Sequence, residues 1–178
     1  MEKNMDLSKS IKSIAIVGPE CTGKSTLAQS LATQYRTNWV EEYAREYVTS
    51  QNYRYNMFDI FRISRKQLEM EDDAIITAND FLICDTNLIV SKIWSNYKFG
   101  SCPEWIQNQI INRDYDLHLL TDIDMPWVED PLREHPDKRQ YFFDLYKKEL
   151  DDLGVCYEII SGNENERLER AMMAIRKL

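Results

Sequence analysis

The segment from Gly18 to Ser25, Gly-Pro-Glu-Cys-Thr-Gly-Lys-Ser, constrains this chain more than any other part of its sequence. Two glycines five residues apart, followed by Lys and Ser, form the P-loop pattern that binds a nucleotide polyphosphate. Such a loop joins a strand to a helix, so that backbone N–H groups and the positive helix end face the phosphates. The apolar run 14–17 before it, and Leu27 and Leu31 at helical spacing after it, supply that context. We therefore predict a nucleoside triphosphate site.

The residues of this loop have separate predicted roles. Lys24 is expected to reach the terminal phosphates, and the Ser25 hydroxyl is expected to ligate Mg²⁺. The predicted ATP-binding residues are Gly18, Glu20, Cys21, Thr22, Gly23, Lys24, Ser25 and Thr26. The alternative is a glycine-containing turn that binds nothing, but the full pattern arises by chance in on the order of 1% of chains.

Composition bounds the class of protein. The chain has 178 residues, of which 43% are hydrophobic and 29% charged, as expected for one globular domain over 1–178. A net charge of −8 argues against a nucleic-acid partner. Four cysteines that occur singly favour a reduced, cytoplasmic setting over a zinc site. The polar stretch 1–11 lacks the apolar core of a signal peptide, and no run approaches about 20 apolar residues, so we expect no membrane partner.

Short apolar runs alternate with helical patterns along the chain. The predicted strands are 13–17, 39–40, 81–84, 116–120 and 155–160. The predicted helices are 24–35, 43–49, 57–77, 88–97, one opened by Pro103, 138–150 and 163–177. This alternation predicts an α/β fold of the P-loop NTPase type, similar to nucleoside and nucleotide kinases, with a five-stranded parallel sheet and helices on both faces. The proline-punctuated segment 121–137 is predicted to be a lid.

Polar residues that follow the strands of such a sheet gather in one cleft at its carboxyl edge. Asp85 closes a buried strand beside the P-loop, which is the position for holding Mg²⁺ together with Ser25. The alternative for this segment is a cap on the following helix. Glu42, at the end of the neighbouring strand, could accept the proton of a substrate hydroxyl, and Arg45 could bind substrate or phosphate. A solvated ion pair is the alternative for these two, and the register leaves open whether Glu41 or Glu42 faces the cleft.

The lid carries the remaining candidates. Arg133 and Arg139 are predicted to neutralise charge on the transferring phosphoryl group, and Trp127 to stack on a ring of the substrate. The alternative is that Trp127 is tucked into the core. A second group of aromatic residues, Trp94, Tyr97 and Trp105, is interpreted as core.

Four motifs together resemble a known family. They are 18–26, Glu-Tyr-Ala-Arg-Glu-Tyr-Val at 42–48, Cys-Asp-Thr at 84–86, and Asp-Met-Pro-Trp-Val-x-Asp-x-x-Arg at 124–133. The chain resembles, from about residue 11 to its end, the ribosylnicotinamide kinase domain at the C-terminus of the bacterial bifunctional NadR proteins. It departs from that pattern at Asn87, where such proteins often have Asp, and at Pro131, where they often have Gly.

The resemblance implies a P-loop kinase that uses ATP and Mg²⁺ to convert nicotinamide riboside to nicotinamide mononucleotide. The residues expected to contact the nucleoside are Glu42, Tyr43, Arg45, Asp85, Asn87 and Trp127. Three alternatives remain: a kinase of another nucleoside, a regulatory ATPase or GTPase, and a nucleotide-binding module without activity. The regulatory alternative is disfavoured because no Asp-x-x-Gly follows the third strand and no Asn-Lys-x-Asp follows the fourth.

Overall fold

Five parallel strands form one sheet in the order β2-β3-β1-β4-β5. The strands are β1 Lys12–Val17, β2 Trp39–Val40, β3 Phe81–Asp85, β4 Leu117–Thr121 and β5 Tyr157–Ile160. The computed structural model describes residues 11–178, so nearly all of the polar stretch 1–11 lies outside the described residues. The predicted fold class, a P-loop α/β fold with a five-stranded parallel sheet, is confirmed.

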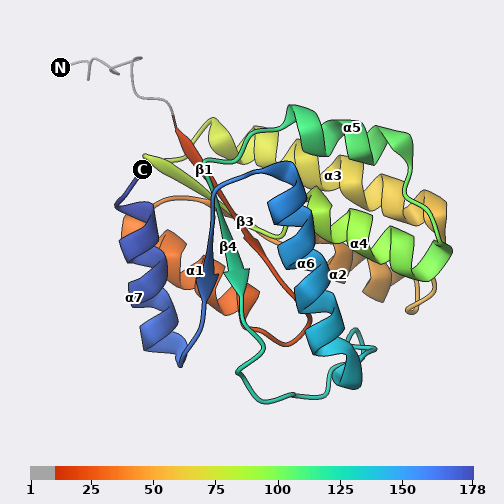
Figure 1. The fold of residues 1–178 in the computed structure, drawn as a ribbon. Helices are drawn as coiled ribbons and strands as arrows, with labels where there is room; N and C mark the ends of the chain where they lie inside the picture. The colour runs from red at the N-terminus through yellow and green to blue at the C-terminus, as the bar shows by residue number, and fades with distance from the viewer. Residues whose placement is uncertain (1–10) are drawn as a thin grey trace.

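Residues 11–178 also form seven α-helices and one short 3₁₀ turn, which connect the strands except for the last helix, which follows β5. They are α1 Lys24–Tyr35, α2 Tyr43–Ser50, α3 Met57–Ile75, α4 Leu88–Phe99, α5 Glu104–Asn112, η1 Pro136–Lys138, α6 Arg139–Leu153 and α7 Glu164–Ile175. Figure 1 shows α1 and α7 on one face of the sheet and α3, α4, α5 and α6 on the other. None of the helices in this part of the chain is long and apolar enough to cross a membrane.

Two core clusters account for the two covered faces. The strand residues Ile14 and Ile16 pack with Leu31 of α1 and Ala171 of α7. On the opposite face, Val17 and the end of β4 pack against α4 and α6, where Tyr146 is fully buried. Side chains on alternate strand positions point to opposite faces, which is why one short strand serves both cores.

The helix starts follow local chemistry. Asn56 and Asn163 each accept backbone N–H groups at the starts of α3 and α7, with Asp59 and Glu166 completing capping boxes. Three predicted starts, at 103, 138 and 163, each fall on the residue directly before the first residue of the helix, for α5, α6 and α7. The strand predicted over 155–160 begins only at 157.

Candidate active site

The P-loop, residues 18–23, joins the end of β1 to α1 and is braced against the end of β4. Gly18 has a φ of +144°, and a Cβ added there would lie 2.4 Å from Thr121 Oγ1, so only glycine fits. The Thr22 hydroxyl is buried and donates to the Pro19 carbonyl at 2.8 Å, and it lies 2.7 Å from the Thr121 hydroxyl. These contacts hold the loop against the end of β4.

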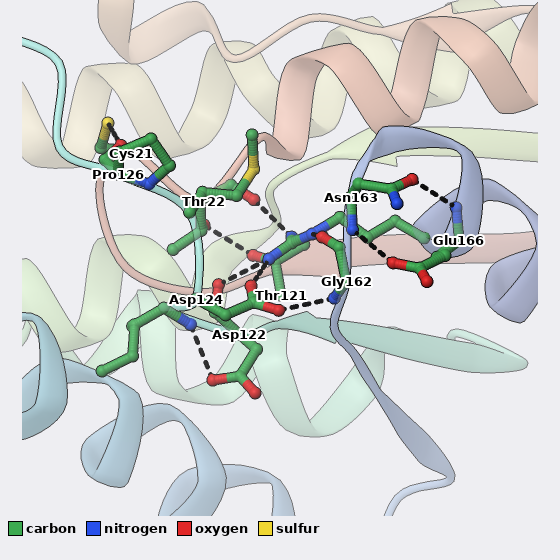
Figure 2. A network of polar contacts seen from close by, with 12 residues as sticks. Cys21, Thr22, Thr121, Asp122, Asp124, Pro126, Gly162, Asn163 and Glu166 are labelled. Carbon is green, nitrogen blue, oxygen red and sulfur yellow. Dashed lines mark hydrogen bonds and ion pairs between the residues drawn. The ribbon is translucent and has the colours of Figure 1, made fainter.

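A buried arginine of α7 holds the back of this loop. Arg167 donates to the carbonyl oxygens of Thr22 and Gly162, each at 2.7 Å, and to that of Asp122 at 3.0 Å, and it forms an ion pair with Asp124. Figure 2 shows these partners converging from the P-loop, the segment after β4 and the turn before α7. No local sequence pattern indicates this role for Arg167, because an arginine in an amphipathic helix ordinarily faces solvent.

The three residues with predicted phosphate or metal roles lie together. Lys24 is the first residue of α1, and its Nζ donates to the Pro19 carbonyl at 2.8 Å. Ser25 is near enough to Asp85 for its hydroxyl to lower the pKa of that carboxylate. Burial, together with the negative charge of Glu42, raises the pKa of Asp85 to about 6, while Ser25, Lys24 and other positive charge oppose the rise.

These donors fit a magnesium ion. Mg²⁺ prefers oxygen ligands and usually binds through one or two protein groups plus phosphate and water. Ser25 and Asp85 supply such oxygens, and Asp85 Oδ1 is buried without a hydrogen-bond partner. Within residues 11–178, no group of three or more His, Cys, Asp and Glu side chains could hold a metal ion by itself. The site therefore suits an ion that arrives with a phosphate.

The corner between β2 and α2 places the predicted base. Gln67, buried on α3, accepts the Tyr43 N–H at 3.0 Å and donates to the Glu41 carbonyl at 3.2 Å, which fixes the backbone at the corner. Glu42 lines the same cavity as the P-loop, and its charge acts on Asp85. Glu41 is exposed and lines only a separate, shallow groove. The structure thus decides the register that the sequence left open, in favour of Glu42.

The lid lies over the P-loop and meets it through several side chains. Arg45 lines the cavity and forms an ion pair with Asp130 of the lid at 3.0 Å. Arg133 also lines the cavity, with Nη1 donating to the Val128 carbonyl. The structure brings Arg45 of α2 and Arg133 of the lid to the lining of the same cavity.

Two residues predicted for the lid have other positions. Arg139 does not line the cavity, because its guanidinium donates to the carbonyl oxygens of Met125 at 2.8 Å and Cys21 at 3.0 Å. Trp127 also lies outside the cavity lining, and its indole N–H donates to Glu129 at 3.1 Å. Arg139 therefore fastens the base of the lid, and Trp127 does not reach a ring in the cavity in this conformation.

Two residues predicted to contact the nucleoside are also placed elsewhere. Asn87 is buried at the start of α4, where Oδ1 accepts the Ile89 N–H at 3.0 Å and Nδ2 lies 3.1 Å from His118 Nε2. For Asn87, the structure shows the capping alternative. Tyr43 lines the shallow groove, and its ring centroid lies 5.9 Å from that of Tyr47.

The cavity itself has a volume of about 220 Å³ and a lining of two chemical kinds. The P-loop and the charged residues described above are polar lining. The remaining side chains are apolar or aromatic: Val48, Tyr55, Ile60, Ile63, Val90, Trp94 and Tyr146. The sequence analysis interpreted Trp94 as core, and its ring both packs on the second core cluster and lines the cavity, because residue spacing does not separate the two positions. The lining suits a ligand that carries both phosphates and an apolar ring system.

Comparison with known proteins finds one matching family and two similar curated proteins. Residues 13–167 match the family described as the AAA domain. The trifunctional NAD biosynthesis/regulator protein NadR of Escherichia coli (strain K12) is 30% identical over 177 residues, which are 94% of this chain and 43% of that protein. The protein of the same description from Salmonella typhimurium (strain LT2) is 30% identical over 129 residues, 69% of this chain and 31% of that protein. The chain spans less than half the length of these curated relatives.

Solved structures show the same fold. A NadR protein in complex with NR superimposes with a TM-score of 0.81 at 23% identity, covering 94% of this chain and 51% of that one. A NadR protein in complex with NAD and AMP-PNP gives 0.76 at 22% identity, covering 94% and 49%. Deoxyadenosine kinase from M. mycoides with bound dCTP gives 0.58 at 14% identity, covering 93% and 100%.

Proposed function

The chain belongs to the AAA domain family, and from that premise we propose that it phosphorylates nicotinamide riboside on its 5′-hydroxyl, with ATP as donor and Mg²⁺ as cofactor. The observation that carries the proposal is the cavity in which Glu42 and the P-loop share one lining with apolar and aromatic side chains. The similarity to NadR proteins, one of them in complex with NR, supports the same substrate.

The residues of the cavity supply the parts that phosphoryl transfer needs. We propose that Glu42 accepts the proton of the attacking hydroxyl and that Lys24 and Arg133 stabilise charge on the transferring phosphoryl group. Ser25 and Asp85 would hold Mg²⁺, which neutralises phosphate charge when bound. Arg45 stands beside the cavity as a candidate for binding substrate hydroxyl groups.

The preferred ring follows from the aromatic lining of the cavity. Tyr55 and Trp94 bring aromatic rings to that lining, where the sequence analysis had expected Trp127 to stack on the substrate. The Trp94 ring stacks on His135 and Phe142, and Lys98 Nζ lies 3.9 Å from the centroid of the Tyr55 ring, so a substrate ring that stacks here would displace one of these neighbours. A positively charged pyridinium ring is attracted to an aromatic face by about 0.5–2 kcal/mol, which is a preference of roughly two- to thirtyfold over a neutral ring.

We also expect the protein to act in the cytoplasm, in keeping with its four free cysteines.

A competition assay tests this proposal. Nicotinamide riboside, adenosine, deoxyadenosine, cytidine and uridine are compared by kcat/KM with ATP and Mg²⁺. We expect nicotinamide riboside to have the highest value and the neutral nucleosides to be weak substrates. If a neutral nucleoside has the highest value, the protein is a kinase of that nucleoside. If ATP is hydrolysed equally with and without nucleosides, a regulatory ATPase replaces the kinase.

A further inference from the structure

Glu20 is a P-loop residue whose side chain is hydrogen-bonded to the lid. Its two carboxylate oxygens accept the backbone N–H of Glu134 at 3.1 and 3.3 Å, and one of them accepts that of His135 at 3.3 Å. Burial raises the pKa of Glu20, while these N–H groups and the charge of Lys24 oppose the rise. The Glu20 carboxylate is expected to repel a bound triphosphate, because it lies in the cavity where the triphosphate is expected.

The backbone N–H of Glu134, which Glu20 binds, directly follows a short turn that carries Arg133, a proposed catalytic residue. Asp130 closes the other end of the turn, because its Oδ1 accepts the Leu132 N–H and its carbonyl accepts the Arg133 N–H, both at 2.9 Å. Arg133 therefore lies between two fixed points, with Glu134 directly after it.

The lid segment at this contact also packs on the aromatic lining of the cavity. The His135 ring stacks on Trp94, with ring centroids 5.7 Å apart and an interplanar angle of 18°. The Glu20 carboxylate thus connects the P-loop to a lid segment that carries Arg133, which lines the cavity, and His135, which stacks on the cavity residue Trp94. Cys21 makes further contacts here, with Sγ accepting the Val128 N–H at 3.1 Å and the carbonyl accepting from Arg139, just after the lid.

We propose that Glu20 is a positioning residue, which holds the lid closed through the backbone N–H groups of Glu134 and His135 and so places Arg133 over the transferring phosphate. The kinetic part of this inference rests on the proposed kinase activity, whereas the contact between P-loop and lid does not. Because the carboxylate repels the triphosphate but holds the catalytic arginine, its loss should lower kcat without raising the KM for ATP. A residue with only a structural role would not separate the two constants in this way.

The test begins with amide hydrogen exchange in the free protein, followed residue by residue by NMR. In Glu20→Ala, the amides of Glu134 and His135 should exchange at least about tenfold faster than in wild type, because charge-assisted hydrogen bonds to them are lost. Glu20→Gln keeps an acceptor oxygen, so the exchange rates of the two amides in this variant should lie between those of wild type and Glu20→Ala. The matched control, Glu46→Gln on α2, removes an exposed carboxylate and should leave both amides unchanged. Wild-type exchange of these amides in Glu20→Ala would overturn the proposal.

Kinetics then test the positioning role. We expect kcat to fall about tenfold in Glu20→Ala and less in Glu20→Gln, with the KM for ATP unchanged or lower. In a background of Arg133→Ala, Glu20→Ala should have little further effect on kcat, because the residue that it positions is already gone. Additive losses in kcat, or a raised KM alone, would refute action through Arg133. If wild-type protein phosphorylates no nucleoside, the proposed function fails, while the exchange experiment still decides whether the contact holds the lid.

Discussion

Replacing Arg167 by alanine should be among the most destabilising single changes in this chain. The side chain is 2% exposed, donates to three carbonyl oxygens at 2.7 to 3.0 Å and pairs with Asp124. Hydrogen bonds from a charged donor contribute about 1.5–3 kcal/mol each, and acceptors left buried without a partner add a further cost. Since Asp124 is partly exposed and can be solvated again, we expect a loss of about 3–5 kcal/mol in the free energy of unfolding.

Urea unfolding followed by circular dichroism measures this loss. With a denaturant dependence of about 2 kcal/mol per molar urea, the midpoint should fall by roughly 2 M. The matched control is Arg170→Ala, which makes the same change one turn away at an exposed position of α7, and it should shift the free energy by no more than about 0.5 kcal/mol. Arg167→Lys should lie between the two, because a lysine keeps the charge but lacks the planar set of donors.

Equal midpoints for the Arg167→Ala and Arg170→Ala variants would refute this reasoning. A second measurement separates bracing of the P-loop from general stability. Arg167 donates to the Thr22 carbonyl inside the P-loop. Arg167→Ala should therefore also weaken ATP binding, measured without urea under conditions in which the variant is fully folded. Unchanged ATP affinity in folded Arg167→Ala would show that the loop keeps its shape without this contact.

Three further outcomes are expected. Lys24→Ala should abolish phosphoryl transfer without unfolding the protein, and turnover within tenfold of wild type would contradict its role at the phosphates. Glu42→Gln should lower kcat by roughly 10²-fold and Glu41→Gln should not, as measured with saturating ATP; the reverse result would make Glu41 the base. Burial raises the pKa of Glu71 from 4.5 to about 7, so the folded state binds the extra proton and stability should fall as pH rises from about 4.5 to 7. Glu71→Gln should remove that part of the pH dependence in urea titrations, and identical pH profiles for the two proteins would refute it.

Much of the fold was predictable because its signals are local. The strands that carry Val17 and Asp85 are continuous apolar runs, and the helix that follows the P-loop shows its spacing in Leu27 and Leu31. Boundaries were less certain where packing decides them. The strand predicted from 155 begins at 157, with Val155 packed on the second core cluster before the ladder starts.

Predictions for the lid were less complete, because its positions depend on contacts with distant segments. Of the two arginines singled out there, Arg133 lines the cavity, whereas Arg139 is used to join the lid to the Cys21 carbonyl. Of the aromatic residues, Trp127 lies outside the cavity lining and Trp94 lies in it. The local patterns place Trp94 on a helix and Trp127 in a proline-punctuated segment, but they do not show which ring reaches a cavity, and the packing of α4 against the lid decides that.

The sequence by itself determined the phosphate-binding loop, the alternation of strands and helices, and the gathering of Asp85 and the Glu41–Glu42 pair at one edge of a parallel sheet. These follow from residue types and spacings within a few neighbours, where backbone geometry leaves little choice. The tertiary structure alone decided that Glu42 rather than Glu41 enters the cavity, that Glu20 binds the lid, and that Arg167 braces the P-loop from 145 residues away. The positions of these three side chains depend on contacts between segments that are distant in the sequence. Many such contacts together stabilise each position, and no local sequence pattern encodes them.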